Sequence, residues 1–158
     1  KIKFDRCFSS PSLRCRETAK IVAKNKKILN NNLLKEIDYG DAEGLDLKEL
    51  NKKYPEIINS WKKALDPRFP KGESLKDVNA RLKKFIKNKV IFKNFNYLII
   101  THNVVLRCLI GSIYKINKKE WYKIDINYFD LLEFISKNGR LIGNIDRKKY
   151  LNIFKNFY

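Results

Sequence analysis

The chemistry of this chain centres on His102, the single histidine among its 158 residues. It lies between an apolar segment typical of a strand and an apolar segment typical of a helix, in the run NYLIITHNVVLRCLIGSIY at 96–114. At a strand-to-helix junction the first N–H groups of the helix and the positive end of its dipole point outward together. Such a junction binds anions, and phosphate in particular. A lone histidine is more often structural than chemical, so this hypothesis depends on what else the chain brings to the same place.

Two further residues could act on an anion. Arg14 falls in the first turn of a predicted helix, where its planar guanidinium could grip two oxygens. Glu36 stands at the start of an acidic loop that contains two glycines. The segments 9–14 and 36–43 each follow a predicted strand, as His102 does. Because ligands bind at the carboxyl ends of parallel strands, we expect all three to meet at one edge of a sheet.

The pattern of apolar residues predicts the elements that must position these side chains. Strands are expected at 2–8, 28–34 and 97–101, with an antiparallel pair at 128–135 and 140–145 joined by a turn at 136–139. Helices are expected at 11–25, at 46–53, from 55, at 74–89 and at 103–114, the first with Ser10 as N-cap and Pro11 as its first residue. Strands that alternate with helices indicate an α/β fold with a mainly parallel sheet.

The formal charge of +18 raises the question of nucleic-acid binding. The 27 lysines outnumber the 8 arginines and are scattered over nearly every segment, without an arginine-rich stripe or an aromatic-interleaved patch. Together with 17 asparagines and 19 isoleucines, this composition is typical of A/T-rich codon usage. Nucleic-acid binding is therefore not favoured, although the charge would attract anionic substrates.

Cysteine spacing and hydropathy exclude several classes of protein. Cys7, Cys15 and Cys108 are odd in number and lack zinc-site spacing, so neither a metal site nor a disulfide framework is predicted. No apolar run approaches the roughly 20 residues of a membrane span, and the first residues do not form a secretory signal. Reduced thiols in a cytoplasmic protein that binds no membrane are the expectation.

Four sequence blocks stand in a fixed order along the chain: FSSPSLRCRETA, LKEIDYGDAEGL, FPKGESLKDVNARL and THNVVLRCL. Together they resemble the motifs of the histidine phosphatase superfamily, the phosphoglycerate mutase-like proteins, from residue 4 to about residue 135. The resemblance implies a three-layer sandwich with a mainly parallel sheet flanked by helices. It also implies one domain over 1–158, in which 46–72 forms a cap or substrate loop.

The resemblance assigns a role to each candidate residue. In that family a phosphoryl group is transferred through a phosphohistidine. His102 matches the second histidine, which lies beside the phosphate and stabilises the charged transition state. Arg14 matches the arginine that clamps the phosphate, and Glu36 matches the carboxyl group that acts as general acid and then activates water. The backbone N–H of Asn103 is expected to bind another oxygen of a small phosphorylated substrate, with no cofactor and no metal.

Other polar residues of these blocks receive structural roles. Asp38, Asp41 and Glu43 remain alternatives to Glu36 as the working acid, although Glu43 is expected to be mainly structural. Cys15 and Cys108 are expected to pack in the core. Five further residues are expected to hold loops and helix ends: Arg16, Glu73, Ser74, Arg81 and Arg107.

One family motif has no counterpart in the chain. The family nucleophile lies in an Arg-His-Gly motif at the end of the first strand, and residues 1–158 contain no second histidine. The chain also contains no methionine and opens in a strand-like segment. We therefore expect a sequence truncated at its N-terminus, without the first strand of the family fold, that is inactive and poorly stable alone.

The branch of the family is predicted from the short interval between Glu36 and His102, where mutases carry a longer insertion. This interval favours a phosphatase, so the complete protein is expected to hydrolyse phosphomonoesters. Two alternatives remain open: a non-catalytic member that binds phosphorylated ligands, and a phosphotransferase of the phosphoglycerate mutase type. The oligomeric state is not predicted.

Overall fold

The computed structural model describes residues 3–91, 95–128 and 130–143 of the chain. Its strands are β1 (Arg6–Ser9), β2 (Ile28–Asn30), β3 (Tyr97–Ile100), β4 (Phe134–Lys137) and β5 (Arg140–Gly143). Its α-helices are α1 (Leu13–Ala23), α2 (Leu47–Lys53), α3 (Pro55–Lys62), α4 (Leu75–Lys89) and α5 (Asn103–Ile113). Three 3₁₀ turns span Asn32–Leu34, Gly40–Ala42 and Lys118–Lys123.

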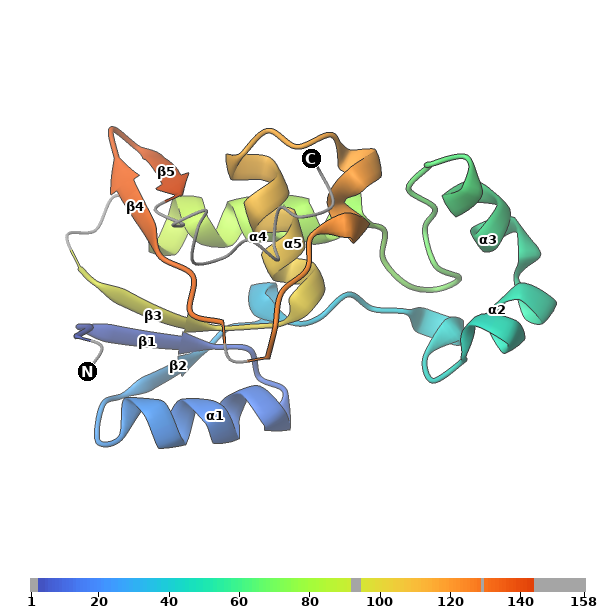
Figure 1. Cartoon of the computed structure of the whole chain (residues 1–158). Helices are drawn as coiled ribbons and strands as arrows, with labels where there is room; N and C mark the ends of the chain where they lie inside the picture. Colours follow the sequence, from blue (N-terminus) through green and yellow to red (C-terminus); the bar gives the residue numbers. More distant parts are fainter. Residues whose placement is uncertain (1–2, 92–94, 129, 144–158) are drawn as a thin grey trace.

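Three parallel strands form the central sheet, in the order β2-β1-β3. Helix α1 covers one face of this sheet, while α4 and α5 cover the other (Figure 1). The predicted α/β sandwich with a parallel sheet is therefore confirmed. The starts of α1 and α5 lie at the same end of the sheet, beyond the carboxyl ends of β1 and β3 (Figure 1).

The antiparallel pair was predicted, but its first strand begins at Phe134 and not at residue 128, and its turn is shorter than expected. Asn138 and Gly139 both have positive φ angles, of 50° and 70°, and they form the turn by themselves. Such Asn-Gly pairs make the two-residue turn whose twist matches that of the flanking strands. Ser136, expected in the turn, therefore belongs to β4, which pairs with β5 from Phe134 onward. The predicted end of the second strand, at 144–145, lies outside the described residues, as does the apolar tail at 150–158.

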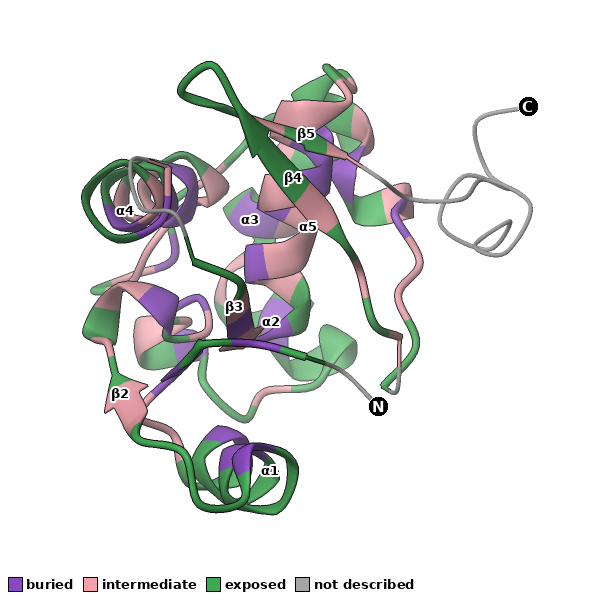
Figure 2. Cartoon of the chain, turned by 90° about the vertical axis from the view of Figure 1, so that its left-hand side faces the viewer, coloured by how far each residue is buried: buried purple, intermediate pink, exposed green. Residues whose placement is uncertain are grey.

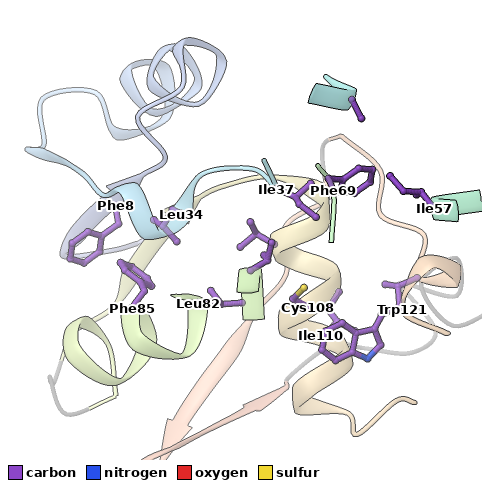
Figure 3. Close-up of a cluster of buried hydrophobic side chains, with 14 of the residues drawn as sticks. Phe8, Leu34, Ile37, Ile57, Phe69, Leu82, Phe85, Cys108, Ile110 and Trp121 are labelled. Carbon is purple, nitrogen blue, oxygen red and sulfur yellow. The ribbon is translucent and has the colours of Figure 1, made fainter. Parts of the chain in front are cut away.

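The main core lies between the sheet and the helices α4 and α5. Phe8 of β1 contacts Phe85 of α4 edge-to-face, with ring centroids 5.2 Å apart, and Leu34 packs in the same cluster (Figure 3). Cys108 of α5 is fully buried there, which confirms its predicted place in the core. Figure 2 shows that α5 has buried and half-buried residues along most of its length. This packing fixes the start of α5, and with it His102.

Helix starts follow the sequence signals, with one exception. Asp46 with Glu49 and Ser74 with Asp77 form the two expected capping boxes of α2 and α4. The start of α1 was predicted two residues too early, because its N-cap is Ser12. Ser10 is unavailable as a cap, since its N–H donates to the Ile100 carbonyl and its hydroxyl lies against His102.

The acidic loop that carries Glu36 is hydrogen-bonded to residues 70–73, which precede α4. The N–H of Asp41 donates to the Pro70 carbonyl, at 2.9 Å, and the N–H of Glu73 donates to the Asp38 carbonyl, at 2.8 Å. These two hydrogen bonds hold the loop against the start of α4. Among the described residues, no helix is both long enough and apolar enough to cross a membrane.

Gly40 allows the acidic loop to approach the backbone of residues 70–72 closely, and replacing Gly40 tests this close approach. Its φ is +54°, and an added Cβ would overlap the Pro70 carbonyl oxygen. Gly40→Ala is therefore expected to lower the free energy of unfolding by about 2–4 kcal/mol, because backbone atoms must move apart. Gly44→Ala is the matched control, since φ is +78° there but the space is open, and about 1 kcal/mol of backbone strain is expected. Equal losses in urea unfolding would contradict the steric explanation.

Candidate active site

His102 is held among side chains of the segment that follows β1. It is the N-cap residue of α5 and is buried, with 6% of its surface exposed. Its Nε2 lies 2.8 Å from the Ser10 hydroxyl and 3.2 Å from the Ser12 hydroxyl. Its Nδ1 lies 2.9 Å from Nη2 of Arg14. The two residues of the prediction that are farthest apart in sequence, Arg14 and His102, are therefore in direct contact.

The arginine determines the protonation state of the imidazole. Because a guanidinium only donates, Nδ1 of His102 must accept from Arg14, and the ring proton must be on Nε2. Nε2–H can then donate to the Ser10 hydroxyl. Burial, and then the positive charges of Arg14 and Arg81, lower the pKa of His102 from 6.5 to about 4. The free site therefore holds a neutral imidazole at neutral pH.

This lowered pKa predicts an acid-labile fold. Between pH 6.5 and about pH 4 the unfolded chain binds a proton at His102 that the folded chain does not, so stability falls as the pH drops through this window. The full effect is about 3 kcal/mol. Urea unfolding of the wild type and of His102→Asn at pH 7 and pH 4.5 isolates it, because other titrating groups are common to both. If the wild type loses no more stability than the variant between these two pH values, the pKa of His102 is not lowered in the folded protein.

Glu36 lies at the start of the same helix. Its carboxylate accepts hydrogen bonds from the N–H of Ile37, at 3.0 Å, and from the N–H of Val104 in the first turn of α5. Burial raises the pKa of Glu36, although these hydrogen bonds and the charges of Arg14 and Arg81 oppose the rise. A carboxyl group with a raised pKa beside a helix N-terminus can exist in the protonated form that a general acid needs.

Arg81 fixes the segment that presents Glu36. Its guanidinium donates to the carbonyls of Leu33, at 2.8 Å, and of Glu36, at 3.0 Å, and it pairs with both carboxylate oxygens of Glu73. Glu73 in turn accepts from the N–H of Asp38. Arg81 and Glu73 therefore have the loop-holding role expected for them, as does Arg107, whose Nε donates to the Ile124 carbonyl.

Three residues at this site were missed by sequence reasoning as contacts of His102. The hydroxyl oxygens of Ser10 and Ser12 lie within hydrogen-bond distance of Nε2–H as acceptors, and Cys15 of α1 places its Sγ 3.5 Å from the same atom. Cys15 is buried as expected, but it packs against the imidazole as well as against the sheet. The signal was present in the block FSSPSLRCRETA, where the N-cap residue Ser12 makes no side-chain hydrogen bond to the helix that it starts.

Asn103 is the first residue of α5, so its backbone N–H group has no carbonyl acceptor within the helix. Its side chain turns away, and Nδ2 donates to the Ile126 carbonyl at 3.4 Å. Two of the alternative candidates for the general acid have other partners. The carboxylate of Asp38 accepts a hydrogen bond from the N–H of Gly40, and Asp41 forms an ion pair with Lys71. Of the four loop acids, Glu36 is the one hydrogen-bonded to the α5 terminus.

Helices α2 and α3 lie beyond the carboxyl ends of the strands, on the same side as the site (Figure 1). Aromatic side chains connect the segment that contains α2 and α3 to the acidic loop. Phe69 contacts Tyr39 with ring centroids 4.9 Å apart, and Trp61 of α3 contacts Phe69 at 5.9 Å. Among the described residues, no three His, Cys, Asp or Glu side chains gather as metal ligands.

Comparison with known proteins agrees with this fold. The sequence model of the histidine phosphatase superfamily (branch 1) matches residues 1–142. The chain belongs to this superfamily. The match confirms the resemblance predicted from the four sequence blocks.

Curated relatives and solved structures show the range of the family. The chain is 33% identical over 120 residues to the phosphoglycerate mutase of Schizosaccharomyces pombe, a match covering 70% of this chain and 57% of that protein. It is 28% identical over 134 residues to a 2,3-bisphosphoglycerate-dependent phosphoglycerate mutase of Rhizobium meliloti, covering 79% and 64%. The alpha-ribazole phosphatase of Shigella flexneri has the same fold, with a TM-score of 0.78 and 19% identity over 92% of this chain and 74% of that one. The chain thus spans less than two thirds of the length of the two curated relatives.

Proposed function

We propose that residues 1–158 form the phosphate-binding part of an enzyme that hydrolyses phosphomonoesters through a phosphohistidine. The observation that carries this proposal is the contact of Arg14 with His102 at the N-terminus of α5, where Glu36 also bonds. An arginine, an imidazole, helix N–H groups and a carboxyl group at one point are the groups that phosphoryl transfer requires.

Arg14 and the start of α5 bind the phosphate in this proposal. The guanidinium donates to two oxygens at once, and the N–H of Asn103 donates to another. The dipole of α5 adds a partial positive charge at the same place. A bound dianion also favours the protonated form of His102. Protonation at Nδ1 ends the hydrogen bond that this atom accepts from Arg14, and the imidazole becomes a cationic donor to the phosphate.

Glu36 moves the protons. In its protonated form it donates to the oxygen of the leaving alcohol while the bond between phosphorus and that oxygen breaks. As a carboxylate it then accepts a proton from the water that hydrolyses the phosphohistidine. The raised pKa of Glu36 supports the first of these steps, since it increases the protonated fraction near neutral pH.

The attacking nitrogen is not assigned to His102. In the free protein Ser10 holds one nitrogen of His102 and Arg14 holds the other, so the imidazole is already oriented beside the place of the transferring group. Residues 1–158 contain no second histidine, and the nucleophile of the proposed reaction therefore lies outside them. The chain alone is expected to bind phosphate without turnover.

Within the single domain, we assign the segment 46–72 as the cap that selects the substrate. The aromatic contacts from Trp61 through Phe69 to Tyr39 support this assignment, because they connect the cap to the loop of Glu36. Tyr54 and Arg68 are further cap residues. We propose a small phosphorylated molecule as the substrate, since the site brings together groups for one phosphate.

A mutase is the second candidate, and the names of the curated relatives favour it. The two activities separate in one assay on the product of the complete coding sequence. With 3-phosphoglycerate as substrate, a phosphatase releases inorganic phosphate, whereas a mutase forms 2-phosphoglycerate and releases little phosphate. A protein that binds phosphate but turns over neither 3-phosphoglycerate nor other phosphomonoesters would be a non-catalytic member.

Binding of inorganic phosphate to residues 1–158 tests the site without turnover. We expect saturable binding, followed by the chemical shifts of His102, whose pKa moves up from about 4 as phosphate binds. Chloride at equal ionic strength is the control for the large positive charge. Equal effects of phosphate and chloride on His102 would overturn the proposed site.

A further inference from the structure

A buried hydroxyl lies against His102 without a part in the proposed chemistry. Ser10 directly follows β1, and its side chain is fully buried. Its oxygen lies 2.8 Å from Nε2 of His102, which is the shortest distance from the imidazole to a neighbouring polar atom in the described part of the chain. Burying a hydroxyl costs free energy unless its hydrogen bonds are made, so its place beside the imidazole needs an explanation.

The sheet fixes the distance between Ser10 and His102. The N–H of Ser10 donates to the carbonyl of Ile100, at 2.9 Å. Ile100 is the last residue of β3 and stands two residues before His102. Since Ser9 is paired with Ile100 in the parallel register of β1 and β3, this hydrogen bond continues the pairing past the ends of both strands. The hydroxyl therefore has a rigid support on the strand next to the one that leads to the imidazole.

The hydrogen bonds around this hydroxyl suit it as an acceptor for the imidazole. The ring proton is on Nε2, because Nδ1 accepts from Arg14. The Ser10 oxygen accepts from Nε2–H and from the N–H of Ser12, at 3.4 Å, while its own proton is directed at the Ser12 hydroxyl, at 3.4 Å. A hydroxyl has one donor and two acceptor positions, and all three are used in this arrangement.

The contact between Arg14 and His102 cannot hold the imidazole in a phosphate complex. In the proposed function Arg14 donates to the phosphate and Nδ1 takes up a proton, so the hydrogen bond between the two side chains is lost. The His102 side chain makes no capping hydrogen bond to α5 either. A half-turn of the ring would exchange each nitrogen for a carbon and aim a C–H group at the phosphate. The contacts at Nε2 must therefore prevent this rotation.

We propose that Ser10 is a positioning residue, whose hydroxyl holds Nε2–H of His102 and so keeps Nδ1 directed at the phosphate after Arg14 has turned to it. Ser10 itself exchanges no proton and forms no bond to phosphorus. Ser12 is a weaker support, since its oxygen is 3.2 Å from Nε2 and its side chain is only half-buried. The thiol of Cys15 is a weak acceptor. The role in the phosphate complex rests on the proposed function, whereas the hold on Nε2–H also exists in the free protein.

Exchange of the Nε2–H proton with water tests this hold in phosphate-free residues 1–158. The single histidine, labelled with ¹⁵N, makes its Nε2–H signal unambiguous. Ser10→Ala removes the acceptor and should speed the exchange at least about tenfold. Ser9→Ala is the matched control, because the Ser9 hydroxyl is equally buried but donates to the Ser10 carbonyl, so the exchange should stay as in the wild type. Faster exchange in Ser12→Ala than in Ser10→Ala would show that Ser12 holds the ring and would overturn the proposal.

Ser10→Cys separates the hydrogen bond from packing. The thiol fills the place of the hydroxyl but accepts hydrogen bonds weakly, so this variant should exchange Nε2–H as fast as Ser10→Ala does. Wild-type exchange in Ser10→Cys would mean that Ser10 only fills space, and the proposal would be wrong. Thermal unfolding shows which variants are folded, and Ser10→Cys decides if Ser10→Ala is not.

Titration with inorganic phosphate tests the role in the complex. In the wild type, phosphate should place a second proton on Nδ1 while the Nε2–H signal persists. Ser10→Ala should bind phosphate about tenfold more weakly, and Ser9→Ala should bind it as the wild type does. If the wild type binds no phosphate although Ser10→Ala speeds the exchange, the proposed function fails, and the role of Ser10 in the complex fails with it. Phosphate binding by the wild type with equal exchange in wild type and Ser10→Ala would overturn the role of Ser10 alone.

Discussion

Replacing Arg14 by alanine should weaken the binding of inorganic phosphate to residues 1–158 by about 10- to 100-fold. The guanidinium lies 2.9 Å from His102 and is exposed on its other side, so it can take a phosphate without rearranging the core. Hydrogen bonds to charged groups contribute about 1.5–3 kcal/mol each, which corresponds to the expected loss. In the product of the complete coding sequence, the same substitution should reduce turnover by orders of magnitude.

Arg16→Ala is the matched control for Arg14→Ala. Arg16 lies two residues further along α1 and is exposed, and removing it takes the same charge from the same helix. If phosphate binding depended only on the net charge of the chain, both variants would lose affinity equally. Unequal loss, with Arg16→Ala near the wild type, is the result expected for a specific clamp.

Removal of Arg14 should also raise the pKa of His102, because its positive charge lowers that pKa in the wild type. The single histidine makes this readout unambiguous in a titration of the imidazole resonances. Arg16 is not among the charges that lower this pKa, so Arg16→Ala should leave the His102 titration unchanged. Near-wild-type phosphate affinity in Arg14→Ala would refute the proposed site.

The sequence predicted the order and type of the elements well, because their signals are local. Alternating apolar runs and the capping boxes at Asp46 and Ser74 specified helices and strands that the structure contains. Boundaries were less accurate where tertiary contacts compete with local preference. The Ser10 hydroxyl is an example, since its contact with His102 comes from a segment 92 residues away.

The meeting of the three candidate residues was predicted from topology, but their contacts were not. Parallel strands bring their carboxyl ends together, so Arg14, Glu36 and His102 were expected at one edge. Sequence could not show that Arg81 donates to the Glu36 carbonyl, or that Cys15 packs on the imidazole. Those contacts depend on the way α1 and α4 pack on opposite faces of the sheet.

His102→Asn should reduce turnover of the product of the complete coding sequence by about 10²–10³-fold, the cost of losing one preorganised donor at a developing charge. Asparagine is a favourable N-cap residue, so α5 should start normally in this variant. Alanine at the same position also removes the imidazole but offers no side-chain cap, and the His102 side chain itself makes no capping hydrogen bond. Comparable losses of turnover in the two variants would show that the imidazole, and not the helix cap, is responsible.

The pH dependence separates a chemical role of His102 from a structural one. If a bound phosphate raises the pKa of His102 from about 4, the substrate complex gains a cationic imidazole that the free protein lacks. Substrate binding by the wild type should then weaken as the pH rises from about 4 to the higher pKa of the complex, and it should level off above that pKa. In His102→Asn this pH-dependent part should disappear while the protein stays folded. A variant that retains both turnover and the wild-type pH profile would show that His102 only caps α5, because an asparagine cannot replace a titrating imidazole.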